Sequence, residues 1–338
     1  MKDLDIVILA AGRGERMVSH KPKVMHEIMG KPLLGHVVDV AGSLEPARTI
    51  VVTGYRRHIV ETYLEGKGVT TAFQEEQKGT AHALACARGH LEGNDVLVLL
   101  GDVPLIETST LIRFLEFCRA ATTIVFLTTD VDDPSGYGRV VMDGDIIADI
   151  REDADATAEE RLIHRINTGI CYIPFRDLAL IDLIDTANKK GERYLTDICK
   201  VARAEGGHAK GFFHPRAEEV LGVNTLKGLL QANTVMRQRI NEEHMARGVT
   251  FLDTDIYVEK DVVIGRETVI APHCHIAGAT VIGEGVYIGP SSIIRNCRIG
   301  DGVTIAGLVF MEGVEAKEGV SIGALSRFKQ DMVLERRA

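Results

Sequence analysis

The sequence contains no tryptophan, and aromatic residues make up only 5% of its 338 residues. Acidic residues outnumber basic ones, which gives a formal net charge of −9. A protein whose main partner is nucleic acid usually presents a basic face with aromatic side chains that stack on bases. The composition therefore argues against nucleic acid as the main partner, although a small anion could still be bound locally.

Cysteines are few and follow no recognisable framework. The six cysteines stand at positions 86, 118, 171, 199, 274 and 297, and no two of them form a Cys-x-x-Cys pair. Zinc sites and disulfide-stapled domains use closely spaced or paired cysteines. We therefore expect free, buried thiols in a reducing compartment.

Long hydrophobic runs are also missing. No apolar stretch approaches the roughly 20 residues that a helix needs to span a bilayer. A first strand is expected from about residue 5, which leaves no space before it for a signal peptide. These features predict a cytoplasmic protein that does not associate with membranes.

The N-terminal stretch 5–23 has the pattern of an anion-binding loop. Five apolar residues at 6–10 predict a short buried strand, and the small residues within 11–14 then allow a turn with exposed N–H groups. Arg16 and Lys23 follow closely, as the neutralisation of a polyphosphate requires. We interpret this stretch as the nucleotide end of an active site.

Two better-known phosphate loops do not fit this stretch. A dinucleotide-binding loop requires a third glycine, where the sequence has Met17, and an acid after the second strand, where it has Thr53 and Gly54. A Walker loop requires Gly-Lys-Ser/Thr, which is also absent. The stretch therefore predicts a nucleotide-binding loop of another class.

The first 225 residues alternate short apolar strands with amphipathic helices. Strands are expected at 49–53, 69–73 and 95–100, and helices at 32–42, 80–89, 178–189 and 195–205. This alternation predicts an α/β domain with a parallel, doubly wound sheet. Ligands of such sheets bind beyond the carboxyl ends of the strands, so the 11–14 loop and Asp102 should share one crevice. Shorter strands over 122–173 suggest an antiparallel insertion that forms its far wall.

After a long helical pattern over 226–248, the periodicity changes to six. Aliphatic residues recur at Val258, Ile264, Ile270, Ile276, Ile282, Ile288 and Ile294. A period of six with one inward aliphatic residue per step is typical of a parallel β-helix. The phase slips before Ile299 and the register is poor beyond Gly307. We expect about four coils of roughly 18 residues over 249–325, and a charged tail over 326–338.

Seven short motifs occur in the order seen in the sugar-nucleotide pyrophosphorylases. They are Leu9 to Met17, Gln74 to Ala81, Gly101 to Leu105, Gly136 to Arg139, Asn167 to Gly169, Tyr194 to Asp197 and Gly222 to Asn224. Over residues 4–305 the sequence resembles most the N-acetylglucosamine-1-phosphate uridylyltransferase half of the bifunctional bacterial GlmU family. The resemblance implies a Rossmann-like nucleotidyltransferase domain over 1–225, a connecting helix over 226–248 and a left-handed β-helix that forms a homotrimer.

The resemblance also implies the reaction. The uridylyl group of UTP is transferred to N-acetylglucosamine 1-phosphate with Mg²⁺, giving UDP-N-acetylglucosamine and pyrophosphate. Because the attacking phosphate oxygen is already an anion, the protein must supply cations and alignment rather than a base. In the bifunctional relatives a longer β-helix ends in an acetyltransferase site. We therefore expect a monofunctional uridylyltransferase without acetyltransferase activity.

Residue roles follow from the same resemblance. Arg16 and Lys23 would be catalytic, and Asp102 and Asn224 would bind Mg²⁺, which prefers hard oxygen ligands. The nucleotide would be held by Leu9, Ala10, Ala11, Gly12, Gly14, Gln74, Gln77, Gly79 and Thr80. The sugar would be held by Gly138, Glu152, Asn167, Tyr194 and Thr196. Leu100 departs from the family pattern, where an aromatic residue precedes the glycine.

Other interpretations remain open from the residues alone. Asp102 could cap a turn or a helix, and Glu152 could lie on a solvated acidic surface. The enzyme could use another sugar or nucleotide, to give UDP-glucose, GDP-mannose or a dTDP-sugar. It could also be a non-catalytic relative that binds sugar nucleotides.

Overall fold

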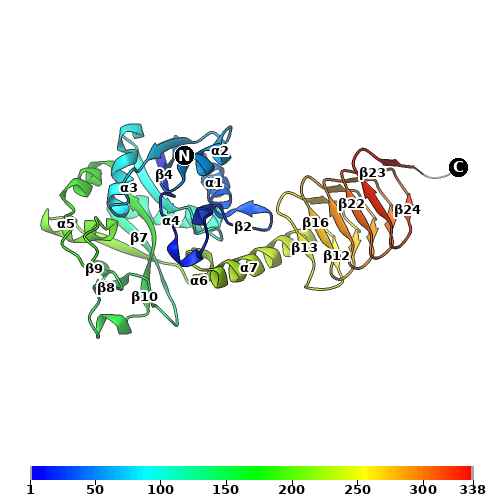
Figure 1. The fold of residues 1–338 in the computed structure, drawn as a ribbon. Helices are drawn as coiled ribbons and strands as arrows, with labels where there is room; N and C mark the ends of the chain where they lie inside the picture. The colour runs from blue at the N-terminus through cyan, green and yellow to red at the C-terminus, as the bar shows by residue number, and fades with distance from the viewer. Residues whose placement is uncertain (1, 336–338) are drawn as a thin grey trace. The chain divides into compact units, whose positions relative to one another are not determined.

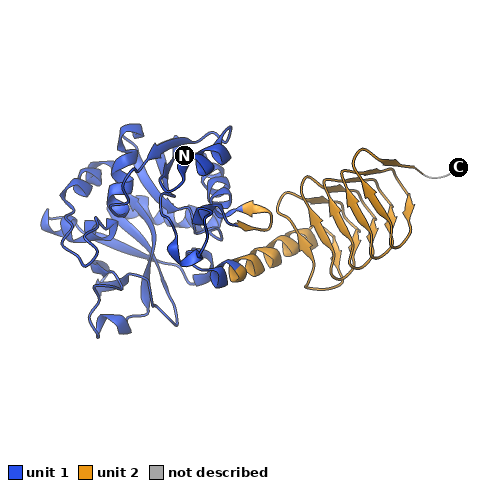
Figure 2. Cartoon of the chain, in the orientation of Figure 1, with its two compact units in different colours: residues 1–26, 32–229 blue, residues 27–31, 230–338 orange. Residues whose placement is uncertain are grey.

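The computed structural model describes residues 2–335 of the chain and divides into two compact units. Unit 1 comprises residues 1–26 and 32–229, and unit 2 comprises residues 27–31 and 230–338, as Figure 2 shows.

A mixed β-sheet forms the centre of unit 1 (Figure 1). Within residues 2–335 it has nine strands in the order β5-β4-β1-β6-β10-β7-β11-β9-β8. They are β1 (Leu4–Leu9), β4 (Arg48–Thr53), β5 (Thr70–Phe73), β6 (Asp95–Leu100), β7 (Ile124–Asp130), β8 (Arg139–Asp143), β9 (Ile146–Arg151), β10 (Arg165–Ile173) and β11 (Ala209–Phe213). The first four strands of this order run parallel, which confirms the predicted α/β class.

Helices cover both faces of the sheet. The α-helices of unit 1 are α1 (Leu33–Ser43), α2 (Arg57–Leu64), α3 (Thr80–Ala87), α4 (Thr108–Ala121), α5 (Ile198–Ala204) and α6 (Ala217–Val220). Short 3₁₀ helices are η1 (Glu15–Met17), η2 (Lys23–Met25), η3 (Arg88–His90), η4 (Glu160–Leu162), η5 (Phe175–Leu183) and η6 (Leu195–Asp197). Along β1, Ile6 and Ile8 pack in one core with α1 and α4, whereas Val7 packs in a second core with α3 and α5. This alternation is that of a strand buried on both faces.

The sheet is not parallel throughout. Strand β10 runs antiparallel to both β6 and β7. The chain reaches β10 after the antiparallel hairpin β8–β9 rather than through the crossover helix that a parallel strand requires. The hairpin and β10 both lie within 122–173, where an antiparallel insertion was expected.

The prediction of a helix over 178–189 is wrong. The structure has the 3₁₀ helix η5, which ends at Leu183. Beyond it, Asp185 accepts a hydrogen bond from the N–H of Ala187, and Asn188 accepts one from the N–H of Lys190. Such local side-chain bonds offer the backbone an alternative to the helix.

Unit 2 contains most of α7 (Leu226–Met245) and a β-helix. Its strands are β12 (Thr250–Phe251), β13 (Tyr257–Val258), β14 (Val263–Ile264), β15 (Val269–Ile270), β16 (His275–Ala277), β17 (Val281–Ile282), β18 (Tyr287–Ile288), β19 (Ile293–Arg295), β20 (Arg298–Ile299), β21 (Thr304–Ile305), β22 (Phe310–Glu312), β23 (Glu315–Ala316), β24 (Ser321–Ile322), β25 (Arg327–Lys329) and β26 (Val333–Leu334). They form three parallel sheets, one per side of the coil. The left-handed β-helix predicted from the six-residue period and the family resemblance is confirmed. The hairpin β2 (Glu27–Ile28) and β3 (Lys31–Pro32) joins this unit at its tip, where the N–H of Met29 donates to Asn233.

The β-helix is longer than expected. Each of its sheets has five strands within residues 2–335, which gives five coils instead of about four. Strands β25 and β26 lie where a charged tail was expected from 326, and positions 336–338 of that tail lie outside the described residues. The apolar column continues because Met311 and Ala316, which are 0% and 1% exposed, fill the positions of isoleucines. The six-residue pattern hides this continuation, because Ile294 to Ile299 and Met311 to Ala316 are steps of only five.

Two other expectations concern cysteines and membrane spans. All six cysteines are free, and all are buried except the half-buried Cys86. Among residues 2–335, no helix combines the length and the apolar character that crossing a membrane would require.

Candidate active site

The predicted crevice lies at the carboxyl ends of β1 and β6. A cavity of about 320 Å³ is lined there by the β1 and β6 ends, the β8–β10 insertion, the start of α3, η6 and the segment after α6. Its wall contains these predicted site residues: Leu9, Arg16, Thr80, Asp102, Gly138, Glu152, Asn167, Thr196 and Asn224. Sequence segments that are far apart are therefore brought to one place.

The 10–14 loop is fixed at one end and open at the other. The N–H of Ala10 donates to Val52, and the carbonyl of Ala11 accepts from the N–H of Tyr55. For the N–H groups of Gly12 and Arg13, the structure of residues 2–335 provides no acceptor. Backbone N–H groups without acceptors are suited to bind phosphate oxygens.

The centre of the site is a contact among Lys23, Asp102 and Asn224. The Lys23 ammonium forms an ion pair with the Asp102 carboxylate and donates to Asn224 Oδ1 at 3.0 Å. The Lys23 and Asp102 side chains are only 16% and 11% exposed. Helix α4 begins at Thr108, and no side chain caps it, so Asp102 does not serve as its cap. One cation thus bridges the two predicted metal ligands.

The same oxygens fit a magnesium ion. A carboxylate and an amide carbonyl are hard oxygen ligands, and Mg²⁺ takes few of these from protein and the rest from phosphate and water. The backbone supports the pair, because the N–H of Val223 donates to the carbonyl of Asp102 at 2.8 Å. The Lys23 ammonium lies against the two oxygens that would hold such an ion.

The opposite end of the cavity carries groups suited to a sugar. Thr196 Oγ1 donates to Glu152 Oε1 at 3.0 Å, and burial raises the pKa of Glu152 above its ordinary value of 4.5 although this hydrogen bond opposes the shift. Asn167 is 9% exposed, and its Oδ1 accepts from the N–H of Gly169 at 3.1 Å, which leaves its Nδ2 to donate to a ligand. Glu152 is therefore not part of a solvated acidic surface.

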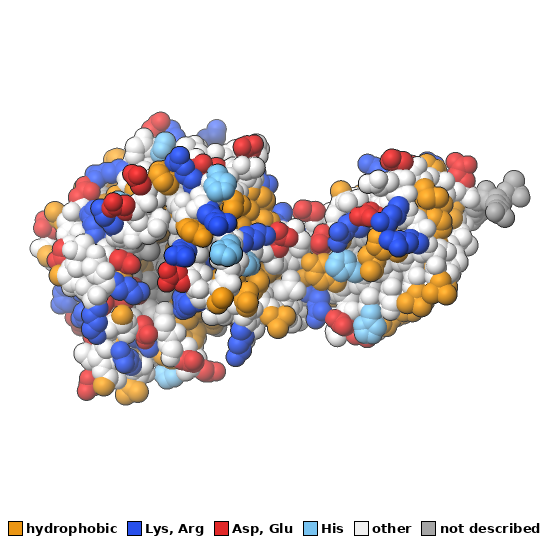
Figure 3. Space-filling view, viewed as in Figure 1, with side chains coloured by type: hydrophobic (Ala, Val, Ile, Leu, Met, Phe, Trp, Pro, Cys, Tyr) orange, Lys and Arg blue, Asp and Glu red, His pale blue; other side chains and the backbone are white. Residues whose placement is uncertain are grey.

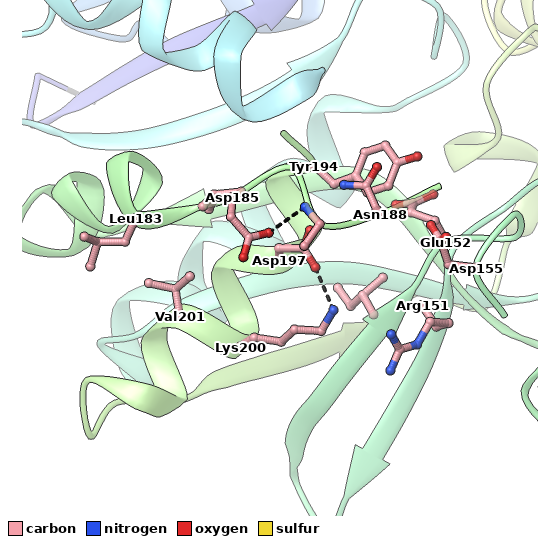
Figure 4. Close-up of a pocket in the computed structure, with 13 residues that line it drawn as sticks. Arg151, Glu152, Asp155, Leu183, Asp185, Asn188, Tyr194, Asp197, Lys200 and Val201 are labelled. Atoms are coloured by element: carbon pink, nitrogen blue, oxygen red, sulfur yellow. Dashed lines mark hydrogen bonds and ion pairs between the residues drawn. The ribbon is translucent and has the colours of Figure 1, made fainter. Parts of the chain in front are cut away.

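Tyr194 lies in a neighbouring cavity. That cavity, of about 400 Å³, is drawn in Figure 4 and shares Glu152 with the first one. The Tyr194 hydroxyl is buried and has no hydrogen-bond partner among the described residues, and burial raises its pKa. Lys200 and Asp197 form an ion pair on another wall of this second cavity.

The residues predicted to contact the base lie on the β5–α3 loop. Gln74 is 3% exposed, whereas Gln77 is exposed, and Thr80 Oγ1 accepts from the N–H of Leu195. Gly79 has φ +102, and a Cβ there would overlap the carbonyl of Arg193. Of this group, only Thr80 lines the 320 Å³ cavity.

The cavity wall also contains Leu100, the position that departs from the family pattern, and Tyr137, which was not among the predicted site residues. Leu100 lies against Gly169, where a Cβ would overlap the Leu100 side chain. Tyr137 also lines the cavity, beside a buried Arg139 whose guanidinium pairs with Asp153 at 3.0 Å. The sequence could have pointed to Tyr137 and Arg139, because both stand within the motif from Gly136 to Arg139.

Comparisons with known proteins agree with this architecture. The sequence matches the MobA-like NTP transferase domain family over residues 6–168. It is 39% identical over 334 residues to "Bifunctional protein GlmU" of Clostridioides difficile strain 630, covering 96% of this chain and 72% of that protein. It is 41% identical over 338 residues to the protein of the same name of Geotalea uraniireducens strain Rf4, covering 97% of this chain and 74% of that protein.

Solved structures share the fold of unit 1. A UDP-glucose pyrophosphorylase complexed with UDP-glucose superposes with a TM-score of 0.57 at 18% identity, covering 71% of this chain and 100% of its own. A putative glucose-1-phosphate thymidylyltransferase from Bacillus anthracis gives 0.55 at 20% identity, with 69% and 94% covered. The fold and the crevice thus define a nucleotidyltransferase. With relatives of about 40% identity along nearly its whole length, the chain belongs to the GlmU family.

Gly14 offers a test of the loop geometry. It has φ +71, and a Cβ there would lie 2.5 Å from Lys23 Cβ. We expect Gly14→Ala to lower the free energy of unfolding by about 1–2 kcal/mol, because an L-residue is strained in this conformation and Lys23 must shift. Urea unfolding of the purified protein measures this. Gly12→Ala is the matched control, because a Cβ at Gly12 meets nothing within 4 Å. Equal effects of the two changes would contradict the account.

Proposed function

We propose that the chain transfers the uridylyl group of UTP to N-acetylglucosamine 1-phosphate, which gives UDP-N-acetylglucosamine and pyrophosphate. The activity is assigned to residues 1–225. The observation that carries this proposal is the cation held between Asp102 and Asn224 beside an N–H-lined loop, because this pairs a metal position with a phosphate position. GlmU family membership supports the uridylyl group and the amino sugar.

The chemistry requires charge neutralisation and alignment. An oxygen of the sugar 1-phosphate attacks the α-phosphorus of UTP, and the bond to the β-phosphate oxygen breaks in line with it. The nucleophile is already an anion, so no general base is needed. The loop N–H groups and Arg16 would hold the triphosphate. The Lys23 ammonium would neutralise the negative charge that develops on the leaving pyrophosphate.

Asp102 and Asn224 would hold Mg²⁺, which when bound screens the negative charge of the phosphates. Before nucleotide arrives, Lys23 compensates the Asp102 carboxylate, whose burial without a counter-ion would be costly. Lys23 is thus placed to serve the carboxylate in the free enzyme and the phosphates in the complex.

The sugar end supplies directional contacts. Glu152 can accept hydrogen bonds from sugar hydroxyls, and Asn167 Nδ2 can donate to the carbonyl of the acetamido group. Thr196 holds the Glu152 carboxylate in place through its hydroxyl. Gly138 keeps the wall close, because a Cβ there would lie 3.3 Å from Glu152 Oε1. Tyr194 would contribute from the neighbouring cavity, whose wall Glu152 also forms.

A substrate panel tests the proposal. With Mg²⁺, we expect the fastest pyrophosphate release from UTP plus N-acetylglucosamine 1-phosphate, and slower release when glucose 1-phosphate replaces the amino sugar or GTP or dTTP replaces UTP. Mass spectrometry identifies the sugar nucleotide formed. A preference for glucose 1-phosphate would assign the enzyme to another specificity, and no turnover of any pair would favour a non-catalytic binding protein.

Asp102 should matter more for turnover than for nucleotide binding. Removal of its negative charge by Asp102→Asn should lower kcat by about 10²-fold or more, as loss of a group that stabilises transition-state charge does. UTP affinity, measured by calorimetry, should change much less. Asp130→Asn is the control, since Asp130 is 49% exposed in a surface pair with Arg165. An equal loss of binding and turnover would overturn the role of Asp102.

We also propose that the β-helix serves assembly into a homotrimer, as the family resemblance implies. Unit 2 exposes apolar side chains among charged ones on the face seen in Figure 3. Val263 and Val281 are neighbours in register and are 56% and 42% exposed, and Ile293 is 41% exposed. Contact between copies would remove such side chains from water. Light scattering after size exclusion should give three times the mass of one chain. A clean monomer at micromolar concentration would refute this assembly.

A further inference from the structure

We propose that His82 is a positioning residue that fixes the side-chain amide of Gln74, so that only its oxygen is offered to the nucleobase. This inference rests on the proposed function and deepens it. It implies that the site selects a base that presents an N–H group, as uracil does at N3, and rejects one that presents a lone pair there, as cytosine does.

The orientation of the Gln74 amide follows from its two neighbours. Gln74 Nε2 lies 3.1 Å from the carbonyl oxygen of Gly79 and 3.0 Å from His82 Nδ1. A carbonyl can only accept a hydrogen bond, so the amide nitrogen rather than the oxygen must face Gly79. The second hydrogen of the same nitrogen then points to His82 Nδ1, which must be the acceptor.

Two consequences follow for the side chains. His82 carries its ring proton on Nε2, because Nδ1 has to present a lone pair to Gln74. Both hydrogens of the Gln74 amide are used, so only Oε1 is left to bind a ligand. Because Gln74 is 3% exposed, its amide cannot rotate freely in solvent.

The other ring nitrogen of His82 faces a cysteine on the same helix. His82 Nε2 lies 4.0 Å from Cys86 Sγ, one turn further along α3, as side chains four residues apart do. Sulfur is a weak acceptor and suits an Nε2–H donor. The tautomer that Gln74 requires is therefore compatible with the contact to Cys86.

Gly79 is held just as firmly. The N–H of Arg193 donates to the carbonyl of Lys78, and the carbonyl of Arg193 accepts from the N–H of Ala81. These two bonds flank Gly79, whose φ of +102 and close approach to Arg193 leave no space for a side chain. The carbonyl that orients Gln74 is thus part of a rigid backbone segment.

The expected result is a nucleotide selectivity that depends on His82. UTP and CTP share ribose and triphosphate, so the ratio of their kcat/KM values isolates the base. His82→Leu removes one of the two acceptors of the Gln74 amide nitrogen and leaves the amide held by the Gly79 carbonyl alone. We expect it to lower the UTP-to-CTP ratio by about 10-fold, the equivalent of one hydrogen bond, mainly through KM for the nucleotide and with KM for the sugar phosphate unchanged.

His82→Asn is the conservative control, because its Oδ1 can accept in place of Nδ1, and it should retain most of the selectivity. An unchanged UTP-to-CTP ratio in His82→Leu would overturn the inference, as would an equal loss in His82→Asn. Failure of the wild-type enzyme to use UTP would instead refute the proposed function, so the two failures are distinguishable.

A measurement on the wild-type protein covers the case in which the leucine variant does not fold. A long-range ¹H–¹⁵N spectrum of histidine-labelled protein reports which ring nitrogen carries the proton, and the signal missing in His82→Asn identifies His82. A proton on Nε2 with an unprotonated Nδ1 supports the inference. A proton on Nδ1 at neutral pH would refute it.

Discussion

Lys23 forms an ion pair with Asp102 and a hydrogen bond with Asn224, and these contacts join three segments of the chain at the carboxyl ends of β1 and β6. The hydrogen-bonded partners of Lys23 are 79 and 201 residues away in the sequence. The pair is largely removed from water, so loss of either charge would leave the other buried and uncompensated. Nearby glycines make the approach possible: a Cβ at Gly14 would meet Lys23, and a Cβ at Gly222 would lie 3.2 Å from Asp102 Oδ2. Gly14 and Gly222, from two different motifs, are therefore both explained by the space that this ion pair requires.

The parts of this site that could be predicted are those set by local pattern. A buried strand followed by small residues predicts an open turn, and Asp102, two residues beyond the end of β6, predicts a side chain at the same carboxyl end of the sheet. What could not be predicted is which side chains meet. Tyr194 and Thr196 are two residues apart and were assigned to one pocket, yet they lie in different cavities. Thr196 lies within the 3₁₀ turn η6, whereas Tyr194 directly precedes it in extended conformation, so the chain changes direction between them.

The fold, too, has features that the sequence pattern predicts and features that it does not. The six-residue period predicted the β-helix because each inward position must be filled to keep the coil dry. Its length was underestimated because packing requires volume and register rather than isoleucine itself. Asn296, with φ +52, turns one corner, and the next strand begins after a single intervening residue. Likewise, the short strands over 122–173 predict an antiparallel insertion but not the place of β10 inside the main sheet between β6 and β7, because a strand pattern does not record which neighbours the strand pairs with.

Under the proposed function, the two ends of the nucleotide subsite use different physics. Charge holds the triphosphate, and because Coulomb attraction falls off gradually with distance, Arg16 and Lys23 tolerate movement as the phosphates arrive. Hydrogen bonds hold the base, and these weaken steeply when misaligned. The base end therefore needs a rigid frame, which Gly79 and His82 supply around a buried Gln74. Affinity then arises mostly from the loop and its cations. Discrimination among nucleotides arises from the side-chain amide of Gln74, which can only accept a hydrogen bond from the base because both of its hydrogens are already used.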